Sequence, residues 1–206
     1  QKIISKKETF HDIHILEVTI TSDENELKKK KGKYITISYQ DVTDKTNFQN
    51  LEKVVIKELK KMIKVLNLTD KSKCLVVGLG NIKSTPDALG PKTVADVMAT
   101  RYLYEIDEIE VDPNYRNVAT FIPGVTGETG IESSDIVLGI IEKIKPDFVI
   151  TIDALASSSM ERVNKTIQIT DSGIHPGSGV YNNRKELSYE TLHIPVISIG
   201  IPTVIE

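Results

Sequence analysis

Two aspartates occupy positions where a carboxylate can take part in chemistry. Asp87 lies in the turn "GNIKSTPDALGP", which follows the apolar run "CLVVGL", and Asp153 ends the run "DFVITID". Each sits in an uncharged stretch, "STPDALGP" or "VITIDALA", and each is followed by Ala-Leu. Taken singly, such residues often form an Asx-turn or cap a helix. Taken together, they are candidates for a catalytic pair.

Two carboxylates that lie close together cannot both ionise easily, so they share one proton. The ionised member can take a proton from a water that attacks a carbonyl, while the protonated member polarises the carbonyl or protonates the leaving amine. This chemistry hydrolyses peptides. The same pair with one histidine can instead hold a metal ion. His175, in the loop "DSGIHPGSGV", is the candidate third ligand.

Basic residues follow the second aspartate and can bind an acidic substrate side chain. Arg162 lies nine residues after Asp153, and Arg184 and Lys185 follow in the next loop. Arginine matches a carboxylate with two parallel hydrogen bonds, so these residues are candidate substrate contacts, together with His175. Solvated surface charge is the alternative explanation for each of them.

A third possible function is a binding module without catalysis, which grips acidic peptides through Lys28–Lys31 and Arg184. The alternative for the lysine run is a solvated loop. Cys74 opens an apolar strand beside lysines and is interpreted as a small core residue rather than a nucleophile.

The elements that must position these residues alternate from residue 74 onward. Short apolar runs predict strands at 74–79, 117–124, 147–153, 166–170 and 194–201. Helical patterns predict helices at 91–103 and 133–145, the second with Ser133 or Ser134 as its N-cap. Strands that alternate with helices indicate βαβ units and a mostly parallel sheet. Ligands bind outside the carboxyl ends of such strands, where both aspartates would lie.

The N-terminal region has a different pattern. Residues 10–42 alternate as β-strands do, and residues 48–67 form an amphipathic helix that would cover a sheet. We therefore expect an α/β fold of three layers, with a mostly parallel sheet flanked by helices and a small N-terminal β-ribbon subdomain. The expected division is a ribbon of residues 1–45 packed on an α/β catalytic domain of residues 46–206.

Composition limits the classes of function. The 206 residues are 39% apolar and 27% charged, which is typical of a soluble protein, and no apolar run approaches the roughly 18 residues of a membrane span. A net charge of −3 argues against nucleic acid as the main partner. A single cysteine excludes an internal disulfide and fits a reducing compartment. No cofactor is expected. Because the chain begins with Gln1 and stops after "IGIPTVIE", we expect a processed or partial product that lacks C-terminal sequence.

Several long stretches resemble a known family. The runs "CLVVGLGN", "TPDALGP", "PGVTGETGIESSDIVLGIIEKIKPDFVITIDALA", "ERVNKTIQITDSGIHPGSGV" and "IPVISIGIPTV" are similar to the germination protease of spore-forming bacteria. The likeness is dense over residues 74–205 and looser over residues 10–66. More distantly, "VGLGN" resembles the opening of hydrogenase maturation endopeptidases.

The resemblance implies an endopeptidase that is made as a zymogen and degrades small acid-soluble spore proteins during germination. It implies a homotetramer in the cytoplasm of the spore core, and an aspartic-type pair that matches Asp87 and Asp153. A preference for glutamate before the scissile bond would give Arg162, Arg184 or Lys185 a role. In hydrogenase-type relatives the equivalent acids bind a metal with a histidine, which keeps the metal alternative with His175 open.

Overall fold

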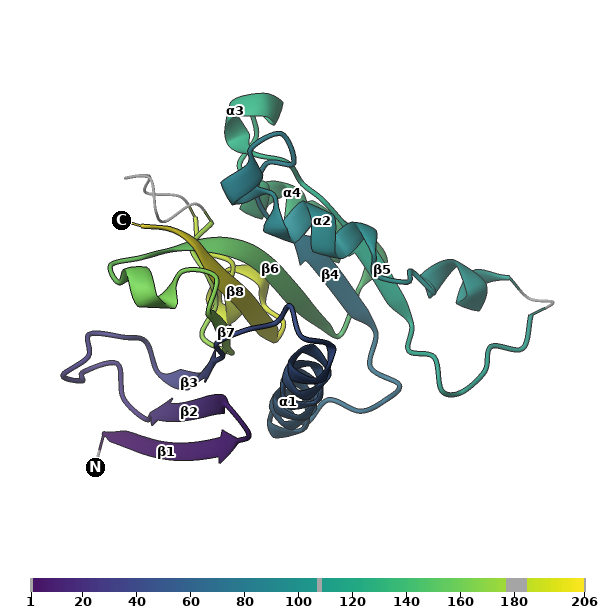
Figure 1. Cartoon of the computed structure of the whole chain (residues 1–206). Helices are drawn as coiled ribbons and strands as arrows, with labels where there is room; N and C mark the ends of the chain where they lie inside the picture. Colours follow the sequence, from purple (N-terminus) through teal and green to yellow (C-terminus); the bar gives the residue numbers. More distant parts are fainter. Residues whose placement is uncertain (1, 107–108, 177–184, 206) are drawn as a thin grey trace.

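Eight strands form a single mixed sheet in the computed structural model, which describes residues 2–106, 109–176 and 185–205. The order across the sheet is β1-β2-β3-β7-β8-β6-β4-β5 (Figure 1). The strands are β1 (Ile3–Phe10), β2 (Ile13–Ile20), β3 (Gly32–Ser38), β4 (Cys74–Gly78), β5 (Val118–Phe121), β6 (Phe148–Ser157), β7 (Thr166–Thr170) and β8 (Val196–Ile205).

The sheet has a parallel half and an antiparallel half. Strands β5, β4, β6 and β8 pair in parallel, whereas β1, β2, β3 and β7 pair antiparallel, and β7 also runs antiparallel to β8. Residues 158–165, which join β6 to β7, are too few for the crossover of a dozen or more residues that a parallel connection needs. The expected parallel arrangement therefore applies to four strands, and β7 departs from it.

Helices cover both faces of the sheet, so the α/β class with its flanking helices is confirmed. The core on one face joins α1 and α2 to Val76 of β4, and the core on the other joins α4 and α5 to Leu75 and Val77. Successive residues of β4 thus pack against the helices on opposite faces of the sheet. The helices are α1 (Lys45–Val65), η1 (Thr85–Asp87), α2 (Leu89–Ala95), η2 (Arg101–Glu105), α3 (Thr126–Thr129), α4 (Ser133–Ile144), η3 (Met160–Arg162) and α5 (Tyr189–Leu192).

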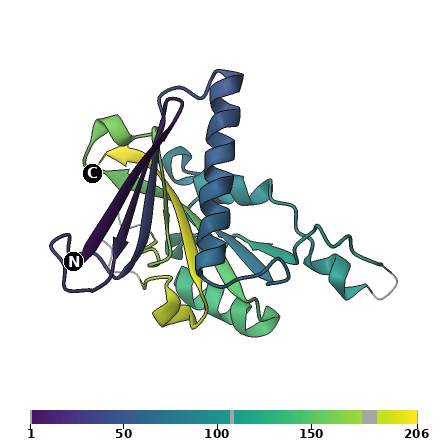
Figure 2. The same ribbon diagram turned by 90° about the horizontal axis from the view of Figure 1, so that it is seen from below.

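The long helix α1 joins the two halves of the sheet on one face. Asp44 caps it by accepting hydrogen bonds from the amides of Thr46 at 2.9 Å and Asn47 at 3.0 Å. Its buried apolar residues share one core with isoleucines of β2 and β3 and with residues of β4 and β6. Figure 2 shows the helix lying alongside the sheet. None of the helices in the described part of the chain combines the length and apolar character that crossing a bilayer requires.

The N-terminal ribbon continues the main sheet instead of lying beside it. Strand β3 pairs with β7 over Tyr34–Ser38, so β1, β2 and β3 extend the sheet at one end. The sequence pattern did not predict β1, because its side chains are mostly exposed and charged, as befits an edge strand. The expected boundary between residues 45 and 46 falls at the first turn of α1, and the division into two units stays a prediction.

Two helix ends differ from the sequence prediction. The expected helix over 91–103 stops at Ala95, because Thr100 pairs with β5: its amide donates to Val118 O, and the Val118 amide donates to its Oγ1, both at 2.9 Å. The N-cap of α4 is Glu132 rather than Ser133 or Ser134. Ser133 instead donates its hydroxyl to Gly124 O at 3.1 Å.

Candidate active site

Asp153 lies at the carboxyl end of the parallel half of the sheet. The Leu79 amide, directly after β4, donates to Ile152 O at 2.8 Å, and Asp153 is the next residue of β6. Asp153 pairs in register with Gly200 of β8 and is only 2% exposed. Asp153 therefore lies in β6 one residue past the point where the pairing with β4 stops, while the pairing of β6 with β8 continues to Ser157, beyond the strand end expected at residue 153.

Gly80 makes the turn that returns the chain to the same edge. Its φ of +112° is a conformation that residues with a side chain rarely adopt. A Cβ placed on Gly80 would also lie 2.1 Å from Asp87 O, which is far inside van der Waals contact. The fold therefore requires glycine here for both its backbone angle and its lack of a side chain.

Asp87 is held by the turn that contains it. The Asn81 amide donates to both the main-chain oxygen of Asp87, at 3.0 Å, and its carboxylate Oδ2, at 2.9 Å. The preceding carbonyl, Pro86 O, accepts a hydrogen bond from Thr203 Oγ1 of β8 at 2.6 Å. Hydrogen bonds thus hold the turn both internally and against β8 of the sheet.

These contacts bring the two segments with aspartates to one edge of the sheet. The short helix η1, which ends in Asp87, packs against both β6 and β8, and Asp153 lies in β6. Asp87 is half-buried and Asp153 is buried. A carboxylate partly open to solvent thus lies at the edge that also holds a buried one.

A cavity of about 430 Å³ lies on the sheet at Gly200, the residue of β8 that pairs with Asp153. Leu155, Ser198 and Gly200 are among the residues that line it. Side chains alternate between the two faces of a strand, so Asp153 points to the same face as Leu155, two residues later. The buried carboxylate and the cavity therefore share one face of the sheet.

The lining of this cavity favours a negatively charged group. Lys29, Arg162 and His175 contribute to it, together with polar residues such as Gln168 and Thr170, and its described lining residues include no carboxylate. The nearest ion-pair partner of His175 is Glu186, whose Oε1 lies 4.0 Å from Nε2. Arginine, lysine and protonated histidine all donate to carboxylates.

Comparison with known proteins places the chain in a family. The family model described as germination protease matches residues 1–206. The chain belongs to the germination protease family. It is 52% identical over 207 residues to the germination protease of Priestia megaterium (strain ATCC 12872 / QMB1551), an alignment that covers 99% of this chain and 56% of the relative. It is 50% identical over 209 residues to that of Bacillus cereus (strain AH187), covering 100% of this chain and 57% of the relative.

The chain thus spans a little over half the length of the germination proteases that it matches. Among solved structures, it is similar to the [NiFe] hydrogenase maturation protease HycI from Thermococcus kodakarensis KOD1, with a TM-score of 0.38 and 19% identity. That likeness covers 64% of this chain and 74% of the other, and it is too weak to carry an argument.

The structure brings together two of the four binding residues expected from the sequence. Arg162 and His175 line the same cavity. Lys185 instead pairs with Asp135 of α4, Nζ to Oδ1, at 2.9 Å, and this hydrogen bond raises the pKa of Lys185. Arg184 lies outside the described residues.

No contact favours the metal alternative. Within residues 2–106, 109–176 and 185–205, no group of three or more histidine, cysteine, aspartate or glutamate side chains is arranged to hold a metal ion. His175 lies among the cavity residues with Arg162, a cation that would repel a metal ion.

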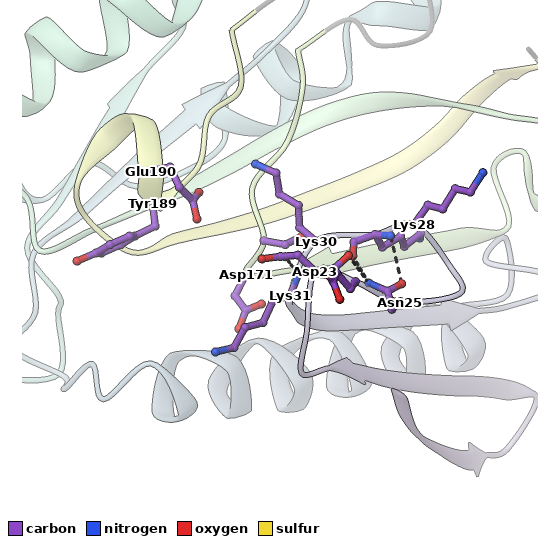
Figure 3. A pocket seen from close by; sticks show the side chains of 11 residues that line it. Asp23, Asn25, Lys28, Lys30, Lys31, Asp171, Tyr189 and Glu190 are labelled. Carbon is purple, nitrogen blue, oxygen red and sulfur yellow. Dashed lines mark hydrogen bonds between the residues drawn. The ribbon is translucent and has the colours of Figure 1, made fainter. Parts of the chain in front are cut away.

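The lysine run lines a different hollow, of about 690 Å³ (Figure 3). Figure 3 shows Asp23 and Asp171 beside the lysines, with Glu190 farther to one side next to Tyr189. Lys30 also pairs with Glu186, and this contact raises the pKa of Lys30. Because the protein's own acids offset much of this positive charge, the structure gives no support to a module that grips acidic peptides here.

Cys74 is a core residue. It is 3% exposed, and burial raises the pKa of its thiol to about 12. Only the thiolate is nucleophilic, so we expect iodoacetamide at pH 8 to leave Cys74 unmodified and to leave any peptidase activity unchanged. Intact-mass spectrometry measures the modification, and urea-unfolded protein serves as the positive control. Rapid alkylation of the folded chain with loss of activity would contradict this assignment.

The sequence pattern marks the two aspartates but not the residues that position them. Gly80 and Asn81 lie in the quoted turn, and the only signal for them was that a glycine there permits a positive φ. Thr203 had no signal, because its contact with Pro86 joins segments far apart in the chain. The positions of Leu155, Ser198 and Gly200 in a cavity follow only from strand pairing.

The Gly80 turn supports a direct prediction. We expect Gly80→Ala to displace Asp87 and to reduce hydrolysis by at least about tenfold, because effective catalysis depends on positioning within fractions of an ångström. Gly127→Ala, where a Cβ would meet nothing within 4 Å, is the control. Initial rates and thermal unfolding of both variants check the prediction, and full activity in Gly80→Ala would contradict it.

Proposed function

We propose that this chain carries the catalytic centre of an aspartic-type endopeptidase, in which Asp87 and Asp153 activate a water molecule. The observation that carries the proposal is the Gly80 turn, which returns Asp87 to the sheet edge where β6 presents Asp153. Membership of the germination protease family supports peptide hydrolysis as the reaction.

The surroundings favour different roles for the two acids. The Asn81 amide donates to Oδ2 of Asp87, and a hydrogen bond from an amide favours the ionised form of a carboxyl group. Asp153 is almost completely buried, and burial favours the neutral form. We therefore assign Asp87 as the base and Asp153 as the acid that holds the shared proton.

The reaction then proceeds in two balanced steps. Asp87 takes a proton from water as the water oxygen bonds to the scissile carbonyl carbon, and Asp153 donates its proton to the carbonyl oxygen, giving a neutral gem-diol. Asp87 next returns its proton to the amide nitrogen as the C–N bond breaks. A hydroxyl of the gem-diol restores the proton of Asp153, so both acids return to their starting forms.

The proposed substrates are small acid-soluble spore proteins. The cavity at Gly200 supports this choice, because Lys29, Arg162 and His175 line it and can receive a glutamate side chain next to the scissile bond. Arg184 and Lys185 stay proposed as further contacts; Lys185 would have to leave Asp135 to take part.

The family also suggests the biological setting of this chain. We propose that it works in the cytoplasm of the spore core, as part of a homotetramer released from a zymogen. Exposed Tyr102, Tyr104, Ile106, Ile109 and Tyr115 lie on an arm that projects from the sheet in both views (Figures 1 and 2). Apolar patches of this kind commonly mark surfaces for association.

Cleavage of a purified acid-soluble spore protein tests the proposal. The wild-type chain, Asp87→Asn and the control Asp70→Asn are compared by mass spectrometry of the products. Asp70 is an exposed partner of Arg116, so its variant controls for the loss of one surface charge. We expect cleavage after glutamate by the wild type and the control only. Wild-type rates in Asp87→Asn would overturn the mechanism.

The cavity makes a separate prediction about specificity. We expect Arg162→Gln to raise KM for a glutamate-containing peptide by about tenfold, since a charge-assisted hydrogen bond contributes roughly 1.5–3 kcal/mol. KM for the corresponding glutamine peptide should change little. Arg101→Gln is the control, because Arg101 pairs with Glu105 on the projecting arm. Equal KM changes for both peptides would contradict a carboxylate contact.

A further inference from the structure

Strand β6 continues past the point where its neighbour β4 leaves the sheet. The register between the two ends at Gly78 opposite Ile152, and the last bond runs from the Leu79 amide to Ile152 O. Strand β6 goes on to Ser157, paired on its other side with β8. Among the described residues, no strand thus pairs with this edge of β6 beside Asp153.

The alternation of the hydrogen bonds along β6 shows which main-chain N–H and C=O groups point to this edge. The Phe148 amide bonds to Lys73 O, and Ile152 O accepts from Leu79, so even-numbered residues of β6 face β4. The Val149 amide bonds to Pro195 O, so odd-numbered residues face β8. The N–H and C=O groups of Ala154 therefore point to the side that β4 has left. Those of Ala156 do so too, because the register shift between Leu155 and Ala156 places the extra residue, Thr203, in β8 and not in β6.

These groups have no partner of their own within the part of the chain that the structure describes, since no backbone or side-chain hydrogen bond there reaches Ala154 or Ala156 from that side. Both residues are half-buried and have the smallest side chain with a Cβ. The outer edge of the sheet differs: β1 carries Lys6, Lys7 and Glu8, charges that discourage pairing.

We infer that the substrate binds by adding its main chain to this edge of β6 as an extended strand, with hydrogen bonds to Ala154 and Ala156. The inference rests on the proposed function and specifies how that site holds its peptide. An exposed strand edge binds peptides through main-chain bonds whatever their side chains, which suits an enzyme that must degrade proteins. The scissile bond is thereby held beside Asp153, the residue that precedes Ala154.

If the substrate binds as a strand, only every second amide of its main chain should contribute to binding, and this can be tested. The probe is a ten-residue peptide with one glutamate that the wild-type chain cleaves, together with variants N-methylated at each single position near the glutamate. N-methylation removes one donor, and in a strand only every second amide faces the partner. We expect kcat/KM to fall about tenfold at alternate positions and to change little between them. If kcat/KM fell without alternating from one N-methylated position to the next, while the unmodified peptide was still cleaved, the inference would be wrong.

Hydrogen exchange supplies a readout that does not need turnover. The probe is the same peptide with the scissile amide reduced to CH₂–NH, added at saturation to the ¹⁵N-labelled chain. We expect exchange at the Ala154 and Ala156 amides to slow at least about tenfold, while the Leu155 amide, which faces β8, is already slow. Unchanged exchange at both alanines would overturn strand addition. Failure of the wild type to cleave the unmodified peptide would instead count against the proposed function.

Discussion

Asp153→Asn is expected to lower kcat for peptide hydrolysis by about a thousandfold or more and to leave KM within about twofold, because general acid–base catalysis contributes roughly 10²–10⁴ per group. Asparagine has nearly the same shape as aspartate but cannot donate a carboxyl proton to the substrate. Asp153 is only 2% exposed and lies within the β6–β8 ladder, so the isosteric change should preserve the packing. Steady-state kinetics and thermal unfolding measure the two effects separately.

The double variant shows whether the two acids act as one unit. If Asp87 and Asp153 handle a single water, Asp87→Asn/Asp153→Asn should lose little more than either single variant, since groups that act together are strongly non-additive. Two acids with separate structural roles would instead give additive losses in stability. A kcat close to that of the wild type in either single variant, with an unchanged fold, would contradict the paired mechanism.

Gly90→Ala is expected to have the largest effect on stability. Gly90 lies in α2 where the helix meets the end of β4 and the middle of β6. A Cβ there would lie 2.2 Å from Leu79 O and 2.3 Å from Ile152 O, two main-chain atoms that cannot move without breaking the sheet edge. Overpacking typically costs about 1–3 kcal/mol, and contact with rigid backbone places this variant at or above the upper end of that range. Urea unfolding measures the change.

Gly139→Ala is the matched control for this prediction. Gly139 lies inside α4, where an added Cβ would meet nothing within 4 Å. Alanine is favoured over glycine in a helix interior by roughly 0.8–1 kcal/mol, so this variant should be slightly more stable than the wild type. Equal stability of the Gly90 and Gly139 variants would show that α2 can move away from the strands.

Local sequence patterns predicted the elements that carry the candidate site. Strands β4 and β6 are continuous apolar runs, and α1 and α4 have clear helical periodicity, so each could be placed without knowledge of its neighbours. Asp87 and Asp153 were found because turn chemistry marks the first and the end of an apolar run marks the second, although β6 continues past Asp153 to Ser157. Their location at one edge follows from the rule for parallel strands.

Features set by distant pairing could not be predicted in this way. Strand β1 is polar and exists as a strand because β2 offers it a full edge, and the helix expected after Pro91 ends early because Thr100 bonds to β5. The cavity joins Lys29 of one loop to Arg162 and His175 of two others. No local pattern records these contacts.

The central position of β8 has a consequence for synthesis on the ribosome. Among the described strands, only β8 pairs with both the antiparallel half, through β7, and the parallel half, through β6, yet it lies at residues 196–205, after the other described strands. A nascent chain therefore carries two sheet fragments that no strand connects until β8 emerges. Both fragments expose strand edges that invite aggregation during that interval. Translation that slows before residue 196 should therefore increase the need for chaperones.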